Sequence, residues 1–395
     1  MINKKEESSK ILKLLYKGNG LSRKEINGIL KIRPTTLQEI INSLTNERLL
    51  HEPERNSRKT GAKSPKLYIN PDYAFLLGID LGSSCLKAVV TDFNGRILHM
   101  EKGEYVAAKD KEKLLKEIFS VISGIKNSEK KLWRKIKGIG LADPGPVDIS
   151  KGISLFACNI KGWNNLRFSE MISERYKLPA ALLTASHAKA LNEHFHSRED
   201  LSSLFVVDMG NGIGAALIRD GELFRGFTNT EMEFGHILVN ENGRQCACGR
   251  NGCLEAETGS PALMHKFKIK TDNGARSILT IDKNINEITL FDIYGACLKN
   301  DPVALSLIHE LAEYLAKGLS YVIQLINPEK IIIHGPLTIL GARLPEYIKH
   351  NLYKYCFPSV VEKTDIECSS LDEFSSASGA CIAIREKLLF KSFLK

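Results

Sequence analysis

Hydrophobic and polar positions along the chain follow two different rhythms, one before and one after about residue 75. In the first region apolar residues recur every three or four positions, which predicts short helices over 10–16, from Ser22 and from Pro34. Ser22 and Glu25 are spaced as the partners of a capping box, and a proline suits the first turn of a helix. The third helix has its apolar face at Leu37, Ile40, Ile41 and Leu44.

Beyond residue 75, short apolar runs alternate with longer helical stretches. Helices are predicted near 110–125 and over 303–326, and the predicted strands are 75–82, 86–92, 95–101, 137–142, 204–214, 215–224 and 330–335. Strands that alternate with helices predict an α/β architecture. A strand that ends in Asp-x-Gly and is followed by a hairpin occurs twice, at Asp80 and at Asp208, which indicates a duplicated unit.

The excess of basic residues is concentrated at the N-terminal end. Residues 1–70 hold 15 Lys and Arg against 7 Asp and Glu, whereas the whole chain holds 55 against 46. This local excess suits a polyanionic partner such as nucleic acid, whose phosphates are bound by Lys and Arg. A merely solvated basic surface is the alternative on charge alone.

A leading helix followed by two short helices joined by a tight turn is the helix-turn-helix pattern. The third helix then reads DNA, because its hydroxyl and amide side chains suit phosphate and base-edge contacts. Segment 55–66 has five basic residues and no acidic one before a strand begins, which predicts a β-wing with a basic tip. The predicted DNA contacts are Arg33, Thr35, Thr36, Gln38, Asn42, Arg58, Lys59 and Lys63. We expect residues 1–70 to form a winged helix-turn-helix DNA-binding domain, with a protein-docking module as the alternative.

The composition is that of an ordinary globular protein. Of 395 residues, 43% are hydrophobic and 26% are charged, which excludes a largely disordered or collagen-like chain. No apolar run approaches the roughly 18 residues of a membrane span, and the polar N-terminus lacks the apolar core of a signal peptide. We therefore expect a cytoplasmic protein without a membrane partner.

Three of the nine cysteines, Cys246, Cys248 and Cys253, cluster after His236. Three thiolates and one imidazole complete a tetrahedral Zn²⁺ site with no open position, so the predicted metal is structural. Two glycines between Cys248 and Cys253 allow the sharp turn that such a site needs. A group of thiols exposed to oxidation is the alternative, and the odd, scattered set argues against a disulfide framework.

The motif Glu233-Phe-Gly-His236, followed by Cys246-Ala-Cys-Gly-Arg-Asn-Gly-Cys253-Leu-Glu255, resembles the ROK family of sugar kinases and sugar-responsive repressors. The resemblance covers about 75–395 and implies an actin/hexokinase-like ATPase fold of two α/β lobes. Lobe one would comprise about 75–190 plus the C-terminal helix and lobe two about 191–374, within a sugar-sensing domain of residues 71–395.

The resemblance also implies a set of sugar-binding residues. The loop 140–148 is similar to the family's Pro-Gly-Pro-Val-Asp loop near the sugar, and segment 158–163 to its Asn-x-x-x-Trp segment. Carboxylates suit sugar hydroxyls because each oxygen accepts a hydrogen bond. The implied sugar-binding residues are Glu233, His236, Glu255 and Asn159, although Asn159 on its own reads equally well as a turn residue.

The residues that phosphoryl transfer needs are altered. Aligning Ala190-Leu-Asn-Glu193 with the family's Ala-Leu-x-Glu helix places Ala185 where the kinases have their catalytic Asp, and 175–192 contains no acidic residue. Ser186 or His187 could replace the base, although a lone histidine there is more often a residue of the helix surface. The nucleotide loops also depart from the family's glycine-rich forms, at Asp80-Leu-Gly82-Ser83-Ser84, Gly210-Asn-Gly212 and His334-Gly-Pro336. Weak ATP binding stays open.

These observations predict a regulator that is not an enzyme. We expect a sugar-responsive repressor of carbohydrate-uptake or catabolism genes, whose affinity for operator DNA changes when a sugar binds in a non-catalytic, kinase-like cleft. Half-sites related by a dyad would require a homodimer or a dimer of dimers. The rivals are an active ATP-dependent sugar kinase with an appended DNA-binding or docking module, and a regulator that has lost ligand control. The sugar, the operator, the direction of the response and a protein effector in place of the sugar are left open.

Overall fold

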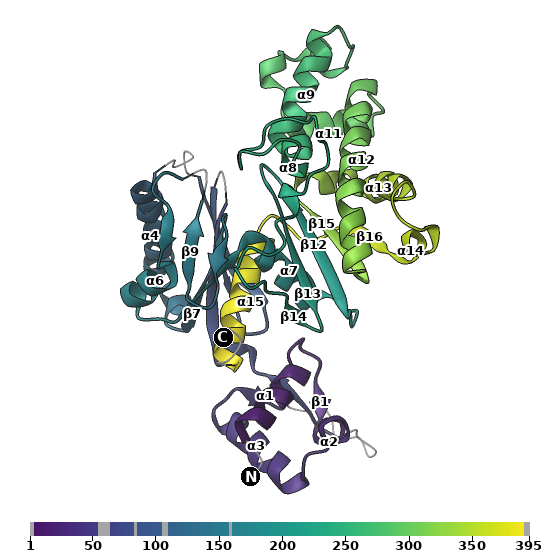
Figure 1. Cartoon of the computed structure of the whole chain (residues 1–395). Helices are drawn as coiled ribbons and strands as arrows, with labels where there is room; N and C mark the ends of the chain where they lie inside the picture. The colour runs from purple at the N-terminus through teal and green to yellow at the C-terminus, as the bar shows by residue number, and fades with distance from the viewer. Residues whose placement is uncertain (1–3, 54–63, 83–84, 105–109, 158–159, 391–395) are drawn as a thin grey trace. The chain divides into compact units, whose positions relative to one another are not determined.

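The computed structural model describes residues 4–53, 64–82, 85–104, 110–157 and 160–390 (Figure 1). The chain divides into two compact units, residues 1–188 with 376–395 and residues 189–375. Within the described residues, no helix combines the length and the apolar character that crossing a bilayer requires.

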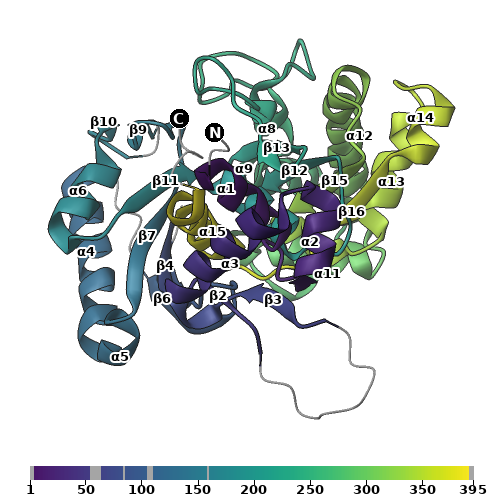
Figure 2. The ribbon, with the colours of Figure 1, turned by 90° about the horizontal axis from the view of Figure 1, so that it is seen from below.

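The N-terminal region of the first unit is a three-helix arrangement with a small antiparallel sheet, as in a winged helix (Figure 2). Its sheet has the strand order β1-β3-β2. The elements are α1 Lys4–Leu14, β1 Leu21–Ser22, α2 Arg23–Leu30, α3 Pro34–Asn46, β2 Leu50–His51 and β3 Lys66–Ile69. The predicted wing residues Arg58, Lys59 and Lys63 lie outside the described residues.

Local signals in the sequence account for the ends of these helices. Ser22 Oγ accepts a hydrogen bond from the Glu25 N–H (3.3 Å) and Glu25 Oε2 accepts one from the Ser22 N–H (2.7 Å), so the predicted capping box is confirmed. Helix α3 begins at Pro34, as predicted, and buries its four predicted apolar residues. The start of α1 was predicted six residues too late, because its first turns are stabilised by charge pairs of Lys10 with Glu6 (3.0 Å) and Glu7 (3.1 Å) rather than by apolar positions.

Two five-stranded sheets repeat one arrangement, which confirms the predicted duplication. In each, the strand that ends in Asp-x-Gly pairs antiparallel with the next strand and parallel with a later one. The first sheet, in spatial order, is β11 Ala180–Thr184, β7 Ile136–Asp143, β4 Phe75–Leu81, β5 Cys85–Thr91 and β6 Ile97–Glu104. The second is β14 Glu222–Leu223, β13 Ile213–Arg219, β12 Ser203–Met209, β15 Lys330–His334 and β16 Asp365–Cys368.

The predicted strand 204–214 is in fact two strands. The Gly210 N–H donates to the Gly212 carbonyl (2.9 Å), and this tight turn separates β12 from β13. A third small sheet in the first unit, which the sequence pattern did not reveal, consists of β8 Val147–Asp148, β9 Ile153–Phe156 and β10 Asn164–Leu166.

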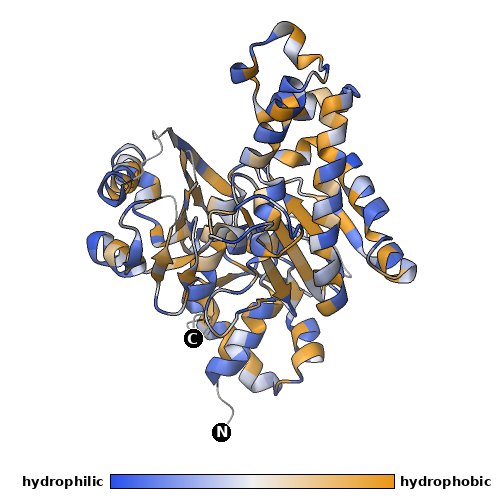
Figure 3. Ribbon diagram, turned by 45° about the horizontal axis from the view of Figure 1, so that its top comes forward, coloured by the Kyte–Doolittle hydropathy of each residue, from blue (hydrophilic) through white to orange (hydrophobic). Residues whose placement is uncertain are grey.

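Helices pack around the sheets of each unit, and Figure 3 shows apolar strands with mixed apolar and polar helices around them. The helices of the first unit include α4 Lys111–Ser128, α5 Lys130–Trp133 and α6 Phe168–Tyr176. Two helices contribute residues to both units, α7 Ala185–His196 and α15 Ser375–Phe390. The second unit contains α8 Leu254–Thr258, α9 Ser260–Asp272, α10 Leu279–Asp282, α11 Leu290–Leu298, α12 Pro302–Leu325, α13 Arg343–Leu352 and α14 Pro358–Lys363. The described residues also contain the short 3₁₀ segments η1 Pro71–Tyr73, η2 Phe234–His236, η3 Ile285–Glu287 and η4 Pro336–Leu340.

Helix α15 joins the N-terminal region to the first sheet through Arg385, which is 1% exposed. Arg385 Nε donates to the Phe93 carbonyl (2.5 Å) and Nη2 to the Tyr16 carbonyl (3.1 Å), and its guanidinium lies 4.6 Å from the Tyr16 ring. Beside it, the Tyr16 hydroxyl donates to Glu386. The N-terminal region is therefore attached to the body by a buried cation and its acceptors.

We predict that Arg385→Met lowers the free energy of unfolding by about 3 kcal/mol, because two buried carbonyls lose a charged donor. Urea denaturation followed by circular dichroism measures this. Hydrogen exchange in α1 should accelerate in the same variant. The control is Arg167→Met, whose exposed side chain forms an ion pair with Glu170 at 3.5 Å. Its expected effect is within about 0.5 kcal/mol. Equal midpoints for Arg385→Met and wild type would contradict the assignment.

Candidate functional site

The four predicted metal ligands come together in the second unit. One donor atom from each of His236, Cys246, Cys248 and Cys253 lies within 4.8 Å of the others. Cys246 Sγ is 3.6 Å from His236 Nδ1, and Cys248 Sγ is 3.6 Å from Cys253 Sγ. Tetrahedral zinc, with Zn–S near 2.3 Å and Zn–N near 2.0 Å, requires separations of about 3.5 Å (S to N) and about 3.8 Å (S to S). These two separations therefore suit a tetrahedral ion, and the number and type of the donors suit a closed one.

Two glycines shape the loop that carries the cysteines. Gly249 (φ +88°) and Gly252 (φ +71°) adopt left-handed conformations, and a Cβ on Gly252 would lie 1.6 Å from the Asn240 carbonyl. The resulting turn lets the Cys246 N–H donate to the Arg250 carbonyl (2.7 Å). Glycine is required at Gly252 because the two backbone segments touch.

The thiols of this loop differ in acidity when no metal is bound. The Arg250 backbone N–H lowers the pKa of Cys248 to about 6, whereas burial raises the pKa of Cys253 to about 12. Burial also raises the pKa of Cys246. Because metals bind thiolates, metal binding must displace protons from Cys246 and Cys253, and affinity should rise with pH.

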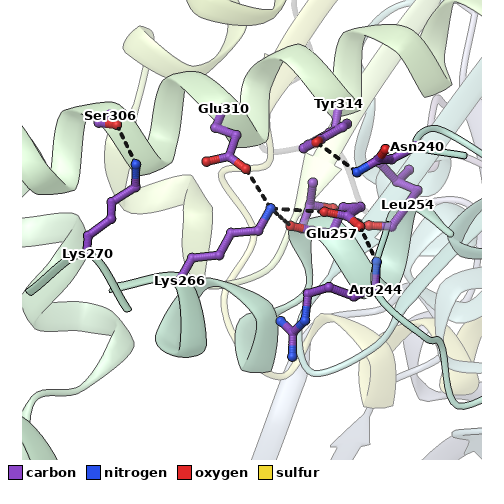
Figure 4. Close-up of polar contacts among 10 residues, drawn as sticks. Asn240, Arg244, Leu254, Glu257, Lys266, Lys270, Ser306, Glu310 and Tyr314 are labelled. Carbon is purple, nitrogen blue, oxygen red and sulfur yellow. Dashed lines mark hydrogen bonds and ion pairs between the residues drawn. The ribbon is translucent and has the colours of Figure 1, made fainter. Parts of the chain in front are cut away.

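A buried network behind the loop ties it to α9 and α12 (Figure 4). Glu257, 3% exposed, accepts the Arg244 N–H at Oε1 (2.9 Å). Lys266 Nζ donates to Glu257 Oε2 (3.1 Å) and to Glu310 Oε1 (2.8 Å), and lies 5.0 Å from the Tyr314 ring. Sequence reasoning missed this network, since only the Cys-Leu-Glu-Ala-Glu spacing marks Glu257 as lying near the loop.

The implied sugar-binding residues of the second unit lie around the predicted metal ligands. Glu233 Oε2 lies 3.8 Å from His236 Nε2, and burial raises the pKa of Glu233. Glu255 Oε2 accepts the Ile213 N–H (2.8 Å), next to the Gly210–Gly212 turn, and Oε1 lies 4.0 Å from Cys246 Sγ. The fourth residue, Asn159, lies outside the described residues.

The residue that the sequence predicts at the kinase base position, Ala185, is the first residue of helix α7. His187 is 4% exposed and Ser186 is 8% exposed, so the expectation that His187 lies on the helix surface was wrong. The first turn of α7 packs closely against α15, since a Cβ on Gly379 would lie 1.8 Å from the Ala188 carbonyl, and the His187 N–H donates to Thr184 Oγ1 (3.1 Å).

A buried carboxyl that sequence reasoning missed ends strand β7. Asp143 is fully buried, its Oδ1 accepts the Gly145 N–H (2.9 Å), and Ser154 and Trp163 lie beside it, joined by an Nε1 to Oγ hydrogen bond of 2.7 Å. Burial raises the pKa of Asp143 to about 7, against hydrogen bonds that lower it. The carboxyl is therefore protonated over much of the acidic range.

The predicted reading helix presents a polar face. Arg33, Thr35, Gln38 and Asn42 are exposed and Thr36 is half-buried, opposite the buried apolar face of α3. Gln38 Nε2 donates to Asn42 Oδ1 (2.7 Å), which aligns the two amides on the helix surface. Amides in this arrangement have donors and acceptors for base edges.

Residues 76–387 match the ROK family. The chain belongs to this family. It is similar to the xylose repressor of Caldicellulosiruptor bescii, at 28% identity over 95% of this chain and 94% of the relative. It also resembles the crystal structure of a ROK family transcriptional regulator, a homologue of the E. coli MLC protein, with a TM-score of 0.86, 25% identity and 99% of each chain covered. A ROK glucokinase from Streptomyces griseus, solved with glucose and AMPPNP, matches 79% of this chain and 100% of its own at a TM-score of 0.70 and 25% identity. These likenesses confirm the predicted fold.

In this ROK chain we predict that Lys266→Met weakens metal binding about 10- to 100-fold, because the buried Glu257 carboxylate loses its cation and the loop loses an anchor. Cobalt(II) titration, followed by its visible absorption, measures the change. The matched control is Lys270→Met, one turn away on α9, whose Nζ contacts only Ser306 (3.1 Å) among the interactions drawn in Figure 4. Equal cobalt affinity in the two variants would show that Lys266 does not position the loop.

A second prediction concerns pH. The folded chain holds the Asp143 proton up to about pH 7, whereas the unfolded chain releases it near 3.8. Asp143 therefore favours folding at low pH and loses that contribution as pH rises toward 7. Relative to Asp143→Asn, wild type should lose about 2 kcal/mol of unfolding free energy between pH 5 and 7.

Urea titrations at the two pH values test this. Asp148→Asn is the control, because hydrogen bonds and charge from Ser150 and Lys151 lower the pKa of Asp148 although burial opposes them. The stabilisation from Asp148 is therefore already complete above its ordinary value of 3.8, and the difference between wild type and Asp148→Asn should stay constant between pH 5 and 7. A constant difference between wild type and Asp143→Asn would contradict the raised pKa.

Proposed function

We propose that this protein is a sugar-responsive transcriptional repressor of carbohydrate-uptake or catabolism genes. The observation that carries the proposal is the combination, in one chain, of an exposed polar reading helix with a ROK body whose kinase base position is Ala185. The similarity to a xylose repressor over nearly the full length of both chains supports it.

Residues 1–70 are the proposed operator-binding domain. Arg33, Thr35, Thr36, Gln38 and Asn42 would contact the major groove, and the basic wing residues Arg58, Lys59 and Lys63 the backbone or minor groove. Winged helices read half-sites related by a dyad, so we propose a homodimer or a dimer of dimers on an inverted repeat.

Residues 71–395 are the proposed sensing domain. Glu233, His236 and Glu255, with Asn159, would bind sugar hydroxyls as acceptors and donors. Zn²⁺ held by His236, Cys246, Cys248 and Cys253 would be structural, since four protein ligands leave no open coordination position. Its contribution is to hold the loop so that Glu255, 4.0 Å from Cys246 Sγ, keeps its place.

A second candidate is an ATP-dependent sugar kinase, favoured by the likeness to a glucokinase solved with glucose and AMPPNP. Phosphoryl transfer to a sugar hydroxyl needs a group that takes the hydroxyl proton. The methyl group of Ala185 cannot do so, and we therefore rank the repressor first. Steady ADP production that depends on one sugar would reverse this ranking.

The deciding experiment selects bound duplexes from a random DNA pool with full-length, zinc-loaded protein. We expect enrichment of an inverted repeat, which then serves to find the sugar that shifts affinity. Gln38→Ala should weaken binding to that repeat about 5- to 100-fold, because a base-edge contact is lost.

The matched control is Ser43→Ala, on a different face of α3, whose hydroxyl donates to Glu47 within the helix (3.1 Å). It should bind the repeat within about twofold of wild type. If only salt-sensitive binding without a preferred sequence appears at about 0.1 M salt, the N-terminal domain is a docking module instead.

A further inference from the structure

The carboxyl edge of the second sheet carries two residues side by side. Asp208 is the last residue but one of β12, His334 ends β15, and the two are direct partners in the parallel register. Ligands of α/β sheets bind at this edge, outside the carboxyl ends of parallel strands. Asp208 also leads into the Gly210–Gly212 turn, the counterpart of a phosphate loop in the kinases that this chain resembles.

Helix α7 contacts both residues with side chains one turn apart. Lys189 Nζ donates to Asp208 Oδ1 at 2.5 Å, and the two side chains are only 19% and 18% exposed. Four residues further on, Glu193 Oε1 lies 2.7 Å from His334 Nε2 and accepts a hydrogen bond from the Ser369 hydroxyl. Residues i and i+4 share a helix face, so one face of α7 covers the edge of the sheet.

The charges on α7 and β12 determine which ligands this edge of the sheet can accept. A carboxylate at the end of a strand beside a phosphate loop attracts a divalent cation with its nucleotide. Here the Lys189 ammonium already supplies the positive charge. A magnesium ion at Asp208 would have to displace Lys189 and leave a largely buried ammonium unpaired, which is strongly unfavourable.

The loop that follows β15 leaves little room for a nucleotide at this edge. Gly335 has φ +109°, and a Cβ there would lie 1.7 Å from the Met209 carbonyl, so the loop after β15 is pressed against the residue that follows Asp208. His334 itself is 4% exposed beneath Glu193. A nucleotide would therefore meet side chains where glycine-rich loops would leave space.

We propose that Lys189 is a specificity-determining residue: as a built-in cation, with His334 and Glu193 beside it, it excludes magnesium nucleotides from this edge. Glu255, which accepts the Ile213 N–H on the far side of the Gly210–Gly212 turn, is left in place for a sugar. The body thus responds to a sugar without a nucleotide. This inference rests on the proposed sensing function and says which ligand class the site rejects.

Calorimetric titration of the full-length, zinc-loaded protein with Mg²⁺·AMPPNP tests the proposal. Wild type should give no saturable heat up to about 5 mM, whereas Lys189→Met, which keeps the aliphatic stem, should bind at least about tenfold more tightly and only with Mg²⁺ present. Lys189→Arg keeps the charge and should behave as wild type. Lys189→Gln repeats the measurement if the Met variant does not fold by circular dichroism.

Two results would overturn the proposal. One is saturable Mg²⁺·AMPPNP binding by wild type at or below about 5 mM. The other is a folded Lys189→Met or Lys189→Gln variant that binds no better than wild type. The titration contains neither sugar nor DNA, so it tests this inference separately from the proposed function. If wild type binds the nucleotide but makes no ADP in the presence of a sugar, only this inference is wrong. Sugar-dependent ADP production would contradict the proposed function.

Discussion

Helix α15 lies so close to the first sheet that neither β4 nor β7 has room for a side chain where it passes. A Cβ on Gly78 would lie 1.9 Å from the Ala377 carbonyl, and one on Gly140 would lie 1.9 Å from the Ala380 carbonyl. This contact sets the height of the helix over the sheet, and with it the reach of Arg385 to Tyr16 and Phe93. The attachment of the N-terminal region therefore depends on two glycines that lie outside it, in β4 and β7.

In the second unit, largely buried lysine ammonium groups hold separate elements together. Lys330, with a side chain 9% exposed, meets Glu199 (2.9 Å), Asp365 (3.2 Å) and Glu367 (3.2 Å), and these hydrogen bonds raise its pKa although burial opposes them. Lys266 joins Glu257 to Glu310 in the same manner. Removing one partner of such a pair costs more than the pair contributes, because the remaining charge stays desolvated. Each cluster thereby fixes segments that hydrophobic packing alone would leave free to shift.

The sequence alone predicted those features that depend on residues close together in the chain. The capping box at Ser22, the first turn at Pro34 and the clustering of His236 with the three cysteines all depend on spacings of a few residues. Contacts between separate elements carried no such signal. The bonds of Lys266 to Glu257 and Glu310 depend on how α9 meets α8 and α12, and Asp143 meets Trp163 only in the folded chain. The hydropathy pattern also predicted a single strand over 204–214. It missed the turn within this segment, because that turn is formed by a backbone hydrogen bond between glycines.

The same limit explains why Lys189 escaped notice. In the sequence it is one lysine in a helix, and Asp208 reads as an intact part of a nucleotide motif. Only the fold shows that Lys189 Nζ and Asp208 Oδ1 form an ion pair at 2.5 Å. The presence of Asp208 in the motif therefore does not indicate that the chain binds a nucleotide. The sugar side differs, since Glu255 is held by the backbone N–H of Ile213, a donor that any residue there would supply. The proposed exclusion of a nucleotide by Lys189 on α7 therefore leaves the Glu255 carboxylate and its backbone donor unchanged.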